Sequence, residues 1–228
     1  KISADFYLQQ ANYPLALEQL VKIDRLIKRK NKKVRYNYIM AQLYQQQSNF
    51  RSAKNKYEQV LKSSPEYEMV FNAKMNLARS LESGSRDTQK MRQNLLKMTR
   101  DDKNKEYLDQ IYFTLAEMDI NNSDTLAAID NYLISTVNSI DNNTQKSLSF
   151  LALARIDYNR SLYRESKFNY DSTIFYMDED FREYEVVKEK HEILQELVYH
   201  LEIISLQDSL QALASLPAPE LSQVISQI

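Results

Sequence analysis

The sequence predicts an all-α fold, in which about five stacked helix pairs form a solenoid that is followed by a long C-terminal helix. Three observations lead to this prediction: a repeating grid of small residues, apolar residues at helical spacing, and a single glycine among 228 residues. Globular chains contain roughly 7% glycine, and both tight hairpins and phosphate-binding loops depend on it. A P-loop nucleotide-binding site and a Rossmann fold are therefore excluded, and an all-β domain is disfavoured.

The grid consists of small residues near the middle of each expected helix. The first-helix alanines are Ala4, Ala41, Ala78, Ala116 and Ala154, which gives steps of 37, 37, 38 and 38 residues. A second set of small residues stands twelve residues after four of these alanines: Ala16, Ala53, Ala128 and Ser166. Small residues let neighbouring helices approach closely, so that each pair can stack on the next. In the third pair Lys90 stands at this position, and we expect that pair to be degenerate.

Turn residues separate the expected helices. Residues 47–49 divide one pair, 63–65 end it, and 121–124 offer N-cap residues for the helix that follows. Gly84, within 82–85, is expected at a helix C-cap. We predict a repeat array over residues 1–178, with its first repeat truncated, and a C-terminal segment over residues 179–228.

The C-terminal segment has its own pattern. Residues 183–215 contain no proline or glycine, and their apolar residues recur at spacings of three and four. This indicates one long helix, or two with a kink, ended by Pro217 and Pro219, with another helix starting at Glu220. Two interpretations stay open: the helix caps the last repeat, or it presents an apolar seam to a partner or to another part of a longer chain.

The second pair resembles the tetratricopeptide repeat. Its matching residues are Met40, Ala41, Tyr44, Ala53, Tyr57 and Pro65. Asn37 replaces the first large aromatic of the signature, and Asp119 and Asp157 replace the aromatic late in the first helix. The period exceeds the usual 34 residues, which suggests extended turns between repeats. The resemblance implies a right-handed superhelical array.

Residues 206–228 carry a second resemblance. The run Gln207-Asp208-Ser209-Leu210-Gln211 before a proline turn resembles a segment of the SprE/PorW-type lipoproteins of the Bacteroidota type IX secretion and gliding machinery. The resemblance implies a periplasmic scaffold, tethered to the outer membrane by an upstream lipidated cysteine, that links the translocon to other subunits. Because the chain starts at Lys1, we expect it to be a piece of a longer protein; the residues alone leave a cytoplasmic location open.

Tetratricopeptide arrays bind polypeptides along the face made by the first helix of each pair. By this resemblance the binding residues are Arg35, Tyr38, Gln42, Gln45, Asn72, Met75, Arg79, Phe113, Glu117, Arg155, Tyr158 and Asn159. Their mixture of aromatics, amides and arginines suits an extended or helical polypeptide. We expect fewer than half of them to touch a ligand. A carboxylate clamp is not expected, because Asn76 alone matches it.

No residue pattern predicts an enzyme, and no cofactor is expected. The chain has no cysteine, which excludes thiolate chemistry. His191 begins a motif like that of zinc proteases, but Gln195 stands where the second ligand is required, and His200 falls on another face. We therefore expect no metal site, and no serine has a histidine in a suitable context.

The charge is nearly balanced, at −1 overall, which gives no general attraction to nucleic acid. A basic run spans residues 22–35. It is interpreted as a solvated helix end, since cations favour helix C-termini, as a docking patch for an acidic protein, or, least favoured, as a contact for nucleic acid or anionic lipid. The expected partner is a protein, with no nucleic acid, no small-molecule substrate and no membrane contact beyond a lipid anchor. The alternatives are a peptide receptor unrelated to secretion and a platform for an enzyme domain elsewhere.

Overall fold

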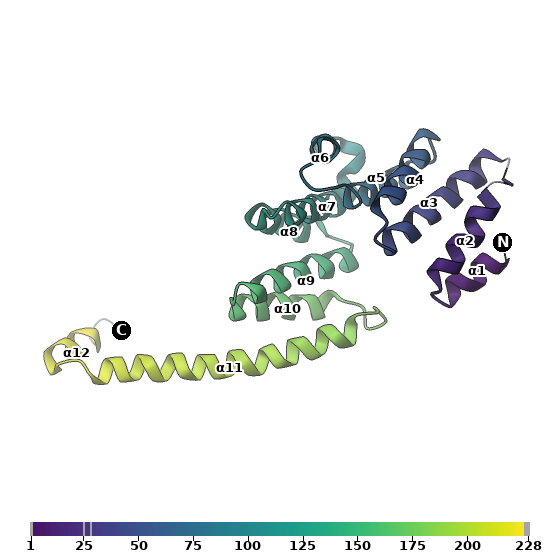
Figure 1. Ribbon diagram of the computed structural model, residues 1–228. Coiled ribbons are helices and arrows are strands. Elements are labelled where there is room, and N and C mark those ends of the chain that lie inside the picture. Colours follow the sequence, from purple (N-terminus) through teal and green to yellow (C-terminus); the bar gives the residue numbers. More distant parts are fainter. Residues whose placement is uncertain (1, 25, 28, 226–228) are drawn as a thin grey trace. The chain divides into compact units, whose positions relative to one another are not determined.

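The computed structural model describes residues 2–24, 26–27 and 29–225 (Figure 1). Within these ranges all regular structure is helical, there are no strands, and helices pack chiefly against their neighbours in sequence. This confirms the predicted all-α class. The chain divides into two compact units, Lys1–Asn138 and Ser139–Ile228.

The first unit holds four helix pairs and a short 3₁₀ helix. These are α1 (Ile2–Gln9) with α2 (Tyr13–Asp24), α3 (Lys30–Gln46) with α4 (Phe50–Lys62), α5 (Tyr67–Arg79) with α6 (Arg86–Met98), then η1 (Asp102–Tyr107), and α7 (Leu108–Asn121) with α8 (Thr125–Asn138). The second unit holds α9 (Asn143–Asn159), α10 (Tyr163–Tyr176), α11 (Tyr184–Ala214) and α12 (Ala218–Ile225). The expected extension between repeats is seen at α6–α7, where η1 lies, whereas four residues join α4 to α5.

The predicted grid lies at the centre of the helix pairs. Ala41 and Ala53 are both 0% exposed, and they share a cluster with Tyr57, which is also fully buried. The equivalent small residues of the later pairs are buried in the same way: Ala116, Ala128, Ala154 and Ser166. Close packing around these positions is what allows two helices to lie side by side over their whole length.

The third pair departs from this arrangement, as the degenerate grid predicts. Lys90 is exposed, and α5 and α6 make few contacts with each other. Six residues, 80–85, connect them, whereas the other pairs have connections of three residues. Gly84 lies in this connection with φ +71°, four residues after the C-cap Ser80, so its expected place at the helix C-cap is wrong. The left-handed backbone still explains why glycine stands there.

The three-residue turns share one geometry. After α3, the backbone amide of Asn49 donates to the carbonyl of Tyr44 at 2.8 Å. The backbone amide of Ser48 donates to the carbonyl of Gln45 at 2.9 Å. These are the paired bonds of a Schellman motif, and Ser48 takes the left-handed position with φ +57°. The same two bonds recur with Ala11, Ser123 and Ser161 at that position. As expected for residues 121–124, Asp124 then caps α8 by accepting from the amide of Ala127 at 3.1 Å.

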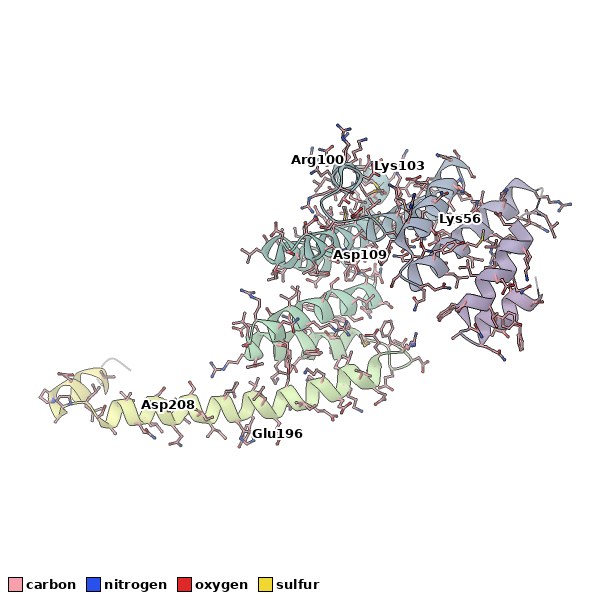
Figure 2. The ribbon with its side chains drawn as sticks, viewed as in Figure 1. Lys56, Arg100, Lys103, Asp109, Glu196 and Asp208 are labelled. Atoms are coloured by element: carbon pink, nitrogen blue, oxygen red, sulfur yellow. The ribbon has the colours of Figure 1, made fainter. Side chains whose placement is uncertain are left out.

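Polar pairs occupy the positions that depart from the tetratricopeptide signature. The carboxylate of Asp119 accepts from Asn131 Nδ2 at 2.7 Å, and that of Asp157 accepts from Asn169 Nδ2 at 2.8 Å. Each pair joins the two helices of one hairpin across twelve residues of sequence. Asn37 is buried, and its Oδ1 accepts at 3.0 Å from Nζ of Lys56, which is labelled in Figure 2.

In the second unit, α11 is a single helix with two different halves. Val187 and Leu194 are buried in a cluster with Leu151, Ala154 and Tyr170, so the first half caps the last pair. Residues 202–212, around Asp208, are all exposed (Figure 2). The next helix, α12, begins at Ala218, two residues before the predicted start.

The basic run lies at two helix ends rather than one. Lys22 is in the last turn of α2 and pairs with Glu18 at 2.6 Å, whereas Lys32 and Lys33 are in the first turns of α3. The prediction that the run favours a helix C-terminus is therefore wrong for most of it, since cations are disfavoured at an N-terminus. Residues 25 and 28 of the run lie outside the described residues.

Candidate protein-binding surface

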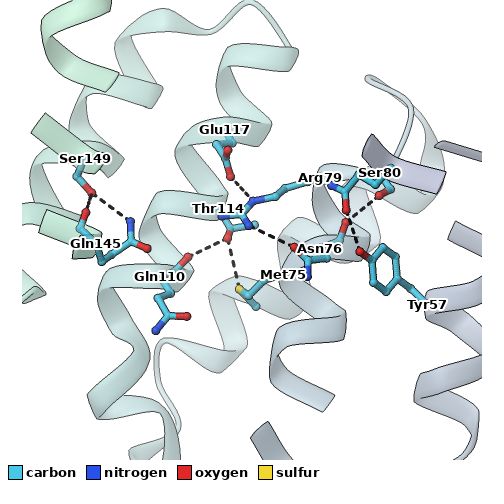
Figure 3. A network of polar contacts seen from close by, with 11 residues as sticks. Tyr57, Met75, Asn76, Arg79, Ser80, Gln110, Thr114, Glu117, Gln145 and Ser149 are labelled. Atoms are coloured by element: carbon cyan, nitrogen blue, oxygen red, sulfur yellow. Dashed lines mark hydrogen bonds and ion pairs between the residues drawn. The ribbon is translucent and has the colours of Figure 1, made fainter. Parts of the chain in front are cut away.

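The first helices α3, α5 and α7 are joined by a chain of polar contacts. Asn76 Nδ2 donates to Tyr38 Oη at 3.1 Å. On its other side, Asn76 Oδ1 accepts from Arg79 Nη1 at 3.3 Å, and these two residues are labelled in Figure 3. Arg79 Nε also donates to the carboxylate of Glu117 as an ion pair. Tyr38 and Arg79 therefore meet through Asn76, whose amide is engaged on both sides, and Glu117 joins them through Arg79.

Aromatic rings extend this network. The Arg79 guanidinium lies 5.6 Å from the centre of the Phe113 ring, which meets Tyr132 edge-on at 5.3 Å. Tyr38 packs in the same manner on Tyr57 at 5.9 Å. The Tyr57 hydroxyl in turn donates at 2.8 Å to Oε1 of Gln45, which is another residue predicted for the binding face. Side chains on this face are therefore held by contacts with several helices.

Burial sets the electrostatics of the network. It raises the pKa of Glu117 above its usual range, although the Arg79 guanidinium acts in the opposite direction. It also raises the pKa of Tyr38, and the hydrogen bond from Asn76 offsets part of that effect. About 30% of each side chain of the Arg79–Glu117 pair is exposed. The pair therefore lies at the edge of the core, within reach of a ligand.

The other predicted residues of the first unit differ in accessibility. Met75 is 3% exposed, and its sulfur accepts from Thr114 Oγ1 at 3.4 Å, which makes it part of the core. Asn72 is half-buried, whereas Arg35 and Gln42 are exposed. Arg35 lines a hollow of about 360 Å³ formed with residues 63–66.

A larger pocket of about 800 Å³ lies beside Arg79, where the α5–α6 connection meets the start of α4. Phe50 and Arg51 are exposed on one wall, and Lys54 pairs there with Asp87. The remaining lining residues are Ser80, Leu81, Glu82, Ser83, Ser85 and Asn121. Sequence reasoning included Arg79 but missed the α4 residues, because second helices were not considered as binding elements.

In the second unit, the predicted residues meet the first half of α11. Arg155 pairs with Glu183 at 2.9 Å and lines a pocket of about 290 Å³ with Tyr170 and Val186. Lys190 Nζ lies over the ring of Tyr158, 3.6 Å from the ring centre. Asn159 is exposed at the end of α9.

The histidine singled out for its zinc-like spacing has a different role. His191 Nε2 lies 2.6 Å from Asp171 Oδ1, and Lys167 Nζ donates to the other oxygen of that carboxylate at 2.8 Å. The three side chains fix α11 against α10. Over the described ranges of the chain, no three histidine or acidic side chains are placed together to hold a metal ion.

Comparison with models of known protein families finds no match, and comparison with curated proteins finds none either. The tetratricopeptide and secretion resemblances therefore rest on the sequence patterns alone. Within the described residues, no helix combines the length and the apolar character that crossing a bilayer requires.

Proposed function

We propose that this chain is a non-catalytic protein-binding scaffold of the tetratricopeptide type, with its helix pairs wound into a right-handed superhelix. One observation carries the proposal: side chains from three consecutive first helices are fixed in one network beside a pocket of about 800 Å³. The tetratricopeptide motif in the second pair supports the same assignment.

A fixed surface favours binding, because less side-chain entropy is lost when a partner docks. Tyr38, Arg79 and Phe113 are held in this way by contacts within the unit. Aromatic and arginine side chains are also those that contribute most to the energy of protein interfaces. The network therefore serves as the rigid base of a binding face rather than as a set of free contacts.

The pocket defines the segment that would fit. Its α4 wall offers the exposed ring of Phe50 beside the guanidinium of Arg51. An apolar side chain next to an acidic one in an extended segment would satisfy both. Lys54 adds a further cation, although Asp87 already pairs with it.

The proposal extends to the secretion machinery through residues 206–228. On this basis the chain belongs to a periplasmic, outer-membrane lipoprotein of a type IX secretion or gliding apparatus, where it links the translocon to other subunits. The alternative is a peptide receptor unrelated to secretion, which the pocket beside Phe50 would also suit. A signal peptide with a lipidated cysteine upstream of Lys1 favours the first assignment, and a directly joined cytoplasmic domain favours the second.

Site-specific crosslinking in cells tests the proposal. A photo-reactive residue replaces Gln42, which is exposed on α3, and captured polypeptides are identified by mass spectrometry. We expect one polypeptide at near-native abundance, and Arg51→Glu should reduce its capture. Secretion subunits among the captured proteins would support the first assignment.

Lys90→Glu is the matched control, because it reverses an exposed cation of α6 that lies outside the pocket. It should leave capture unchanged. Capture of no polypeptide, or equal loss in both charge-reversal variants, would refute the proposed binding face.

A further inference from the structure

The second half of α11 carries an apolar stripe with regular spacing. Its residues are Tyr199, Ile203, Leu206, Leu210 and Leu213, which follow one another at intervals of four, three, four and three. The first four are 61%, 40%, 58% and 50% exposed. Alternation of three and four residues is the spacing of a coiled-coil seam, in which apolar side chains insert between those of a facing helix.

The stripe is distinct from the face that α11 buries in its own unit. At 3.6 residues per turn, the five positions fall within about 80° of one another around the helix axis. Their centre lies roughly 120° from the face that carries Val187, Leu194 and Val198, the residues that are buried in α11. Capping of the last helix pair therefore leaves this stripe unused.

The charges around the stripe are sparse. Asp208 lies on the opposite side of the helix, about 180° from the stripe centre. The flanking positions hold His200, Gln207, Ser209 and Ala214, and the one flanking acidic side chain is Glu202. Charged flanks are what select a different partner and reject an identical one in coiled coils. Here the flanks contain nothing that would reject an identical helix.

We infer that this stripe pairs α11 with α11 of a second copy of the chain, and that the protein is a homodimer through this helix. A two-fold interface uses the same patch on both subunits, and the stripe meets that requirement because Leu206 stands at its middle. In an antiparallel pair of helices centred on Leu206, each Glu202 faces Leu210 of the other helix. This arrangement keeps the two Glu202 carboxylates apart.

The size of the stripe sets the strength of the dimer. Two heptads per helix bury on the order of 1,000 Å² in total, which is at the low end for specific interfaces. The helix is already formed as a continuation of the folded unit, so the cost of nucleating it does not fall on association. We therefore expect a dissociation constant on the order of 10 µM.

Sedimentation equilibrium of the 228-residue chain tests this, over about 1 to 200 µM protein, a range that brackets the expected constant. Leu206→Glu should weaken dimerisation by about 100-fold or more, because it places a charge at the centre of the seam. Ile204→Glu is the matched control: Ile204 is 55% exposed on the same helix but lies about 140° from the stripe. It should leave the dissociation constant within about twofold, and circular dichroism checks that both variants remain helical.

Cysteine crosslinking of the 228-residue chain supplies a second measurement, because these residues include no cysteine. Under mild oxidation, Leu206→Cys should form a disulfide-linked dimer and Ile204→Cys should not. A chain that stays monomeric up to the highest concentration would overturn the inference and leave the stripe to a different protein. So would a dimer that persists in Leu206→Glu, or one that both glutamate variants weaken equally.

Discussion

The serines at the left-handed positions of three of the three-residue turns provide a sharp test of the repeat geometry. Ser48, Ser123 and Ser161 have φ of +57°, +61° and +60°, and all three are exposed. A left-handed conformation costs an ordinary L-residue about 1–2 kcal/mol, whereas glycine adopts it freely but loses about 0.5–1 kcal/mol more backbone entropy on folding. Each Ser→Gly substitution should therefore stabilise the fold by about 0.5–1 kcal/mol.

Thermal and urea unfolding, followed by far-UV circular dichroism, measure this effect. For a chain of this length each substitution should raise the Tm by about 1–4 °C. Because the three turns lie in separate helix pairs, their effects should add, to about 1.5–3 kcal/mol in the triple variant. Ser205→Gly is the matched control, since Ser205 is an exposed residue inside α11. There glycine should destabilise by about 0.5 kcal/mol.

The sign of the change in unfolding free energy decides the outcome of this test. If the turn substitutions destabilise the chain as the control does, the serines do not occupy left-handed positions and the shared turn geometry is incorrect. Unchanged stability in all three would mean that their side chains make compensating contacts in the folded state.

Three further predictions concern helix packing. Asp119→Ala should destabilise by about 2–3 kcal/mol, because it leaves the Asn131 amide without its acceptor and also removes the ion pair with Arg92. In urea unfolding, Asn131→Ala should cost less in the Asp119→Ala background than alone, and equal costs would mean that the two side chains are uncoupled. Burial tends to raise the pKa of Asp171, but hydrogen bonds from Lys167 and His191 outweigh it and hold that pKa below 3.8. The stability that these two hydrogen bonds contribute is complete above pH 3.8 and is lost as the pH falls through the lower pKa of the folded state. Asp171→Asn should therefore flatten that part of an acid-unfolding titration. An unchanged titration profile would contradict this prediction. Ala53→Leu should destabilise by about 1–3 kcal/mol in thermal unfolding, because no space remains at this position, and a neutral result would mean that α3 and α4 can separate.

Sequence reasoning predicted the elements that depend on one repeated physical constraint. The alanines at 41 and 53 had to be small for two helices to touch, and both are fully buried. Lys90 breaks that constraint, and the pair that contains it makes few internal contacts. Residue size at a fixed interval was therefore enough to predict both the regular pairs and the irregular one.

The polar contacts were not predictable in the same way. Asp119 was recognised as a departure from the family pattern, but its partner Asn131 was not, because apolar periodicity contains no information about which polar groups meet. Asn76 was considered only as a ligand for a carboxylate, whereas it holds Tyr38 and Arg79. The start of α3 within the basic run was missed because neither proline nor glycine marks it.

The sparse contact between α5 and α6 has a consequence for how the first unit opens. In a stack of helix pairs, cooperativity is transmitted through each neighbouring interface, and local opening occurs where that coupling is weakest. Amide protons in α6 should therefore exchange with deuterium faster than those in α4 or α8. Partial unfolding would then begin in the interior of the unit rather than at its ends.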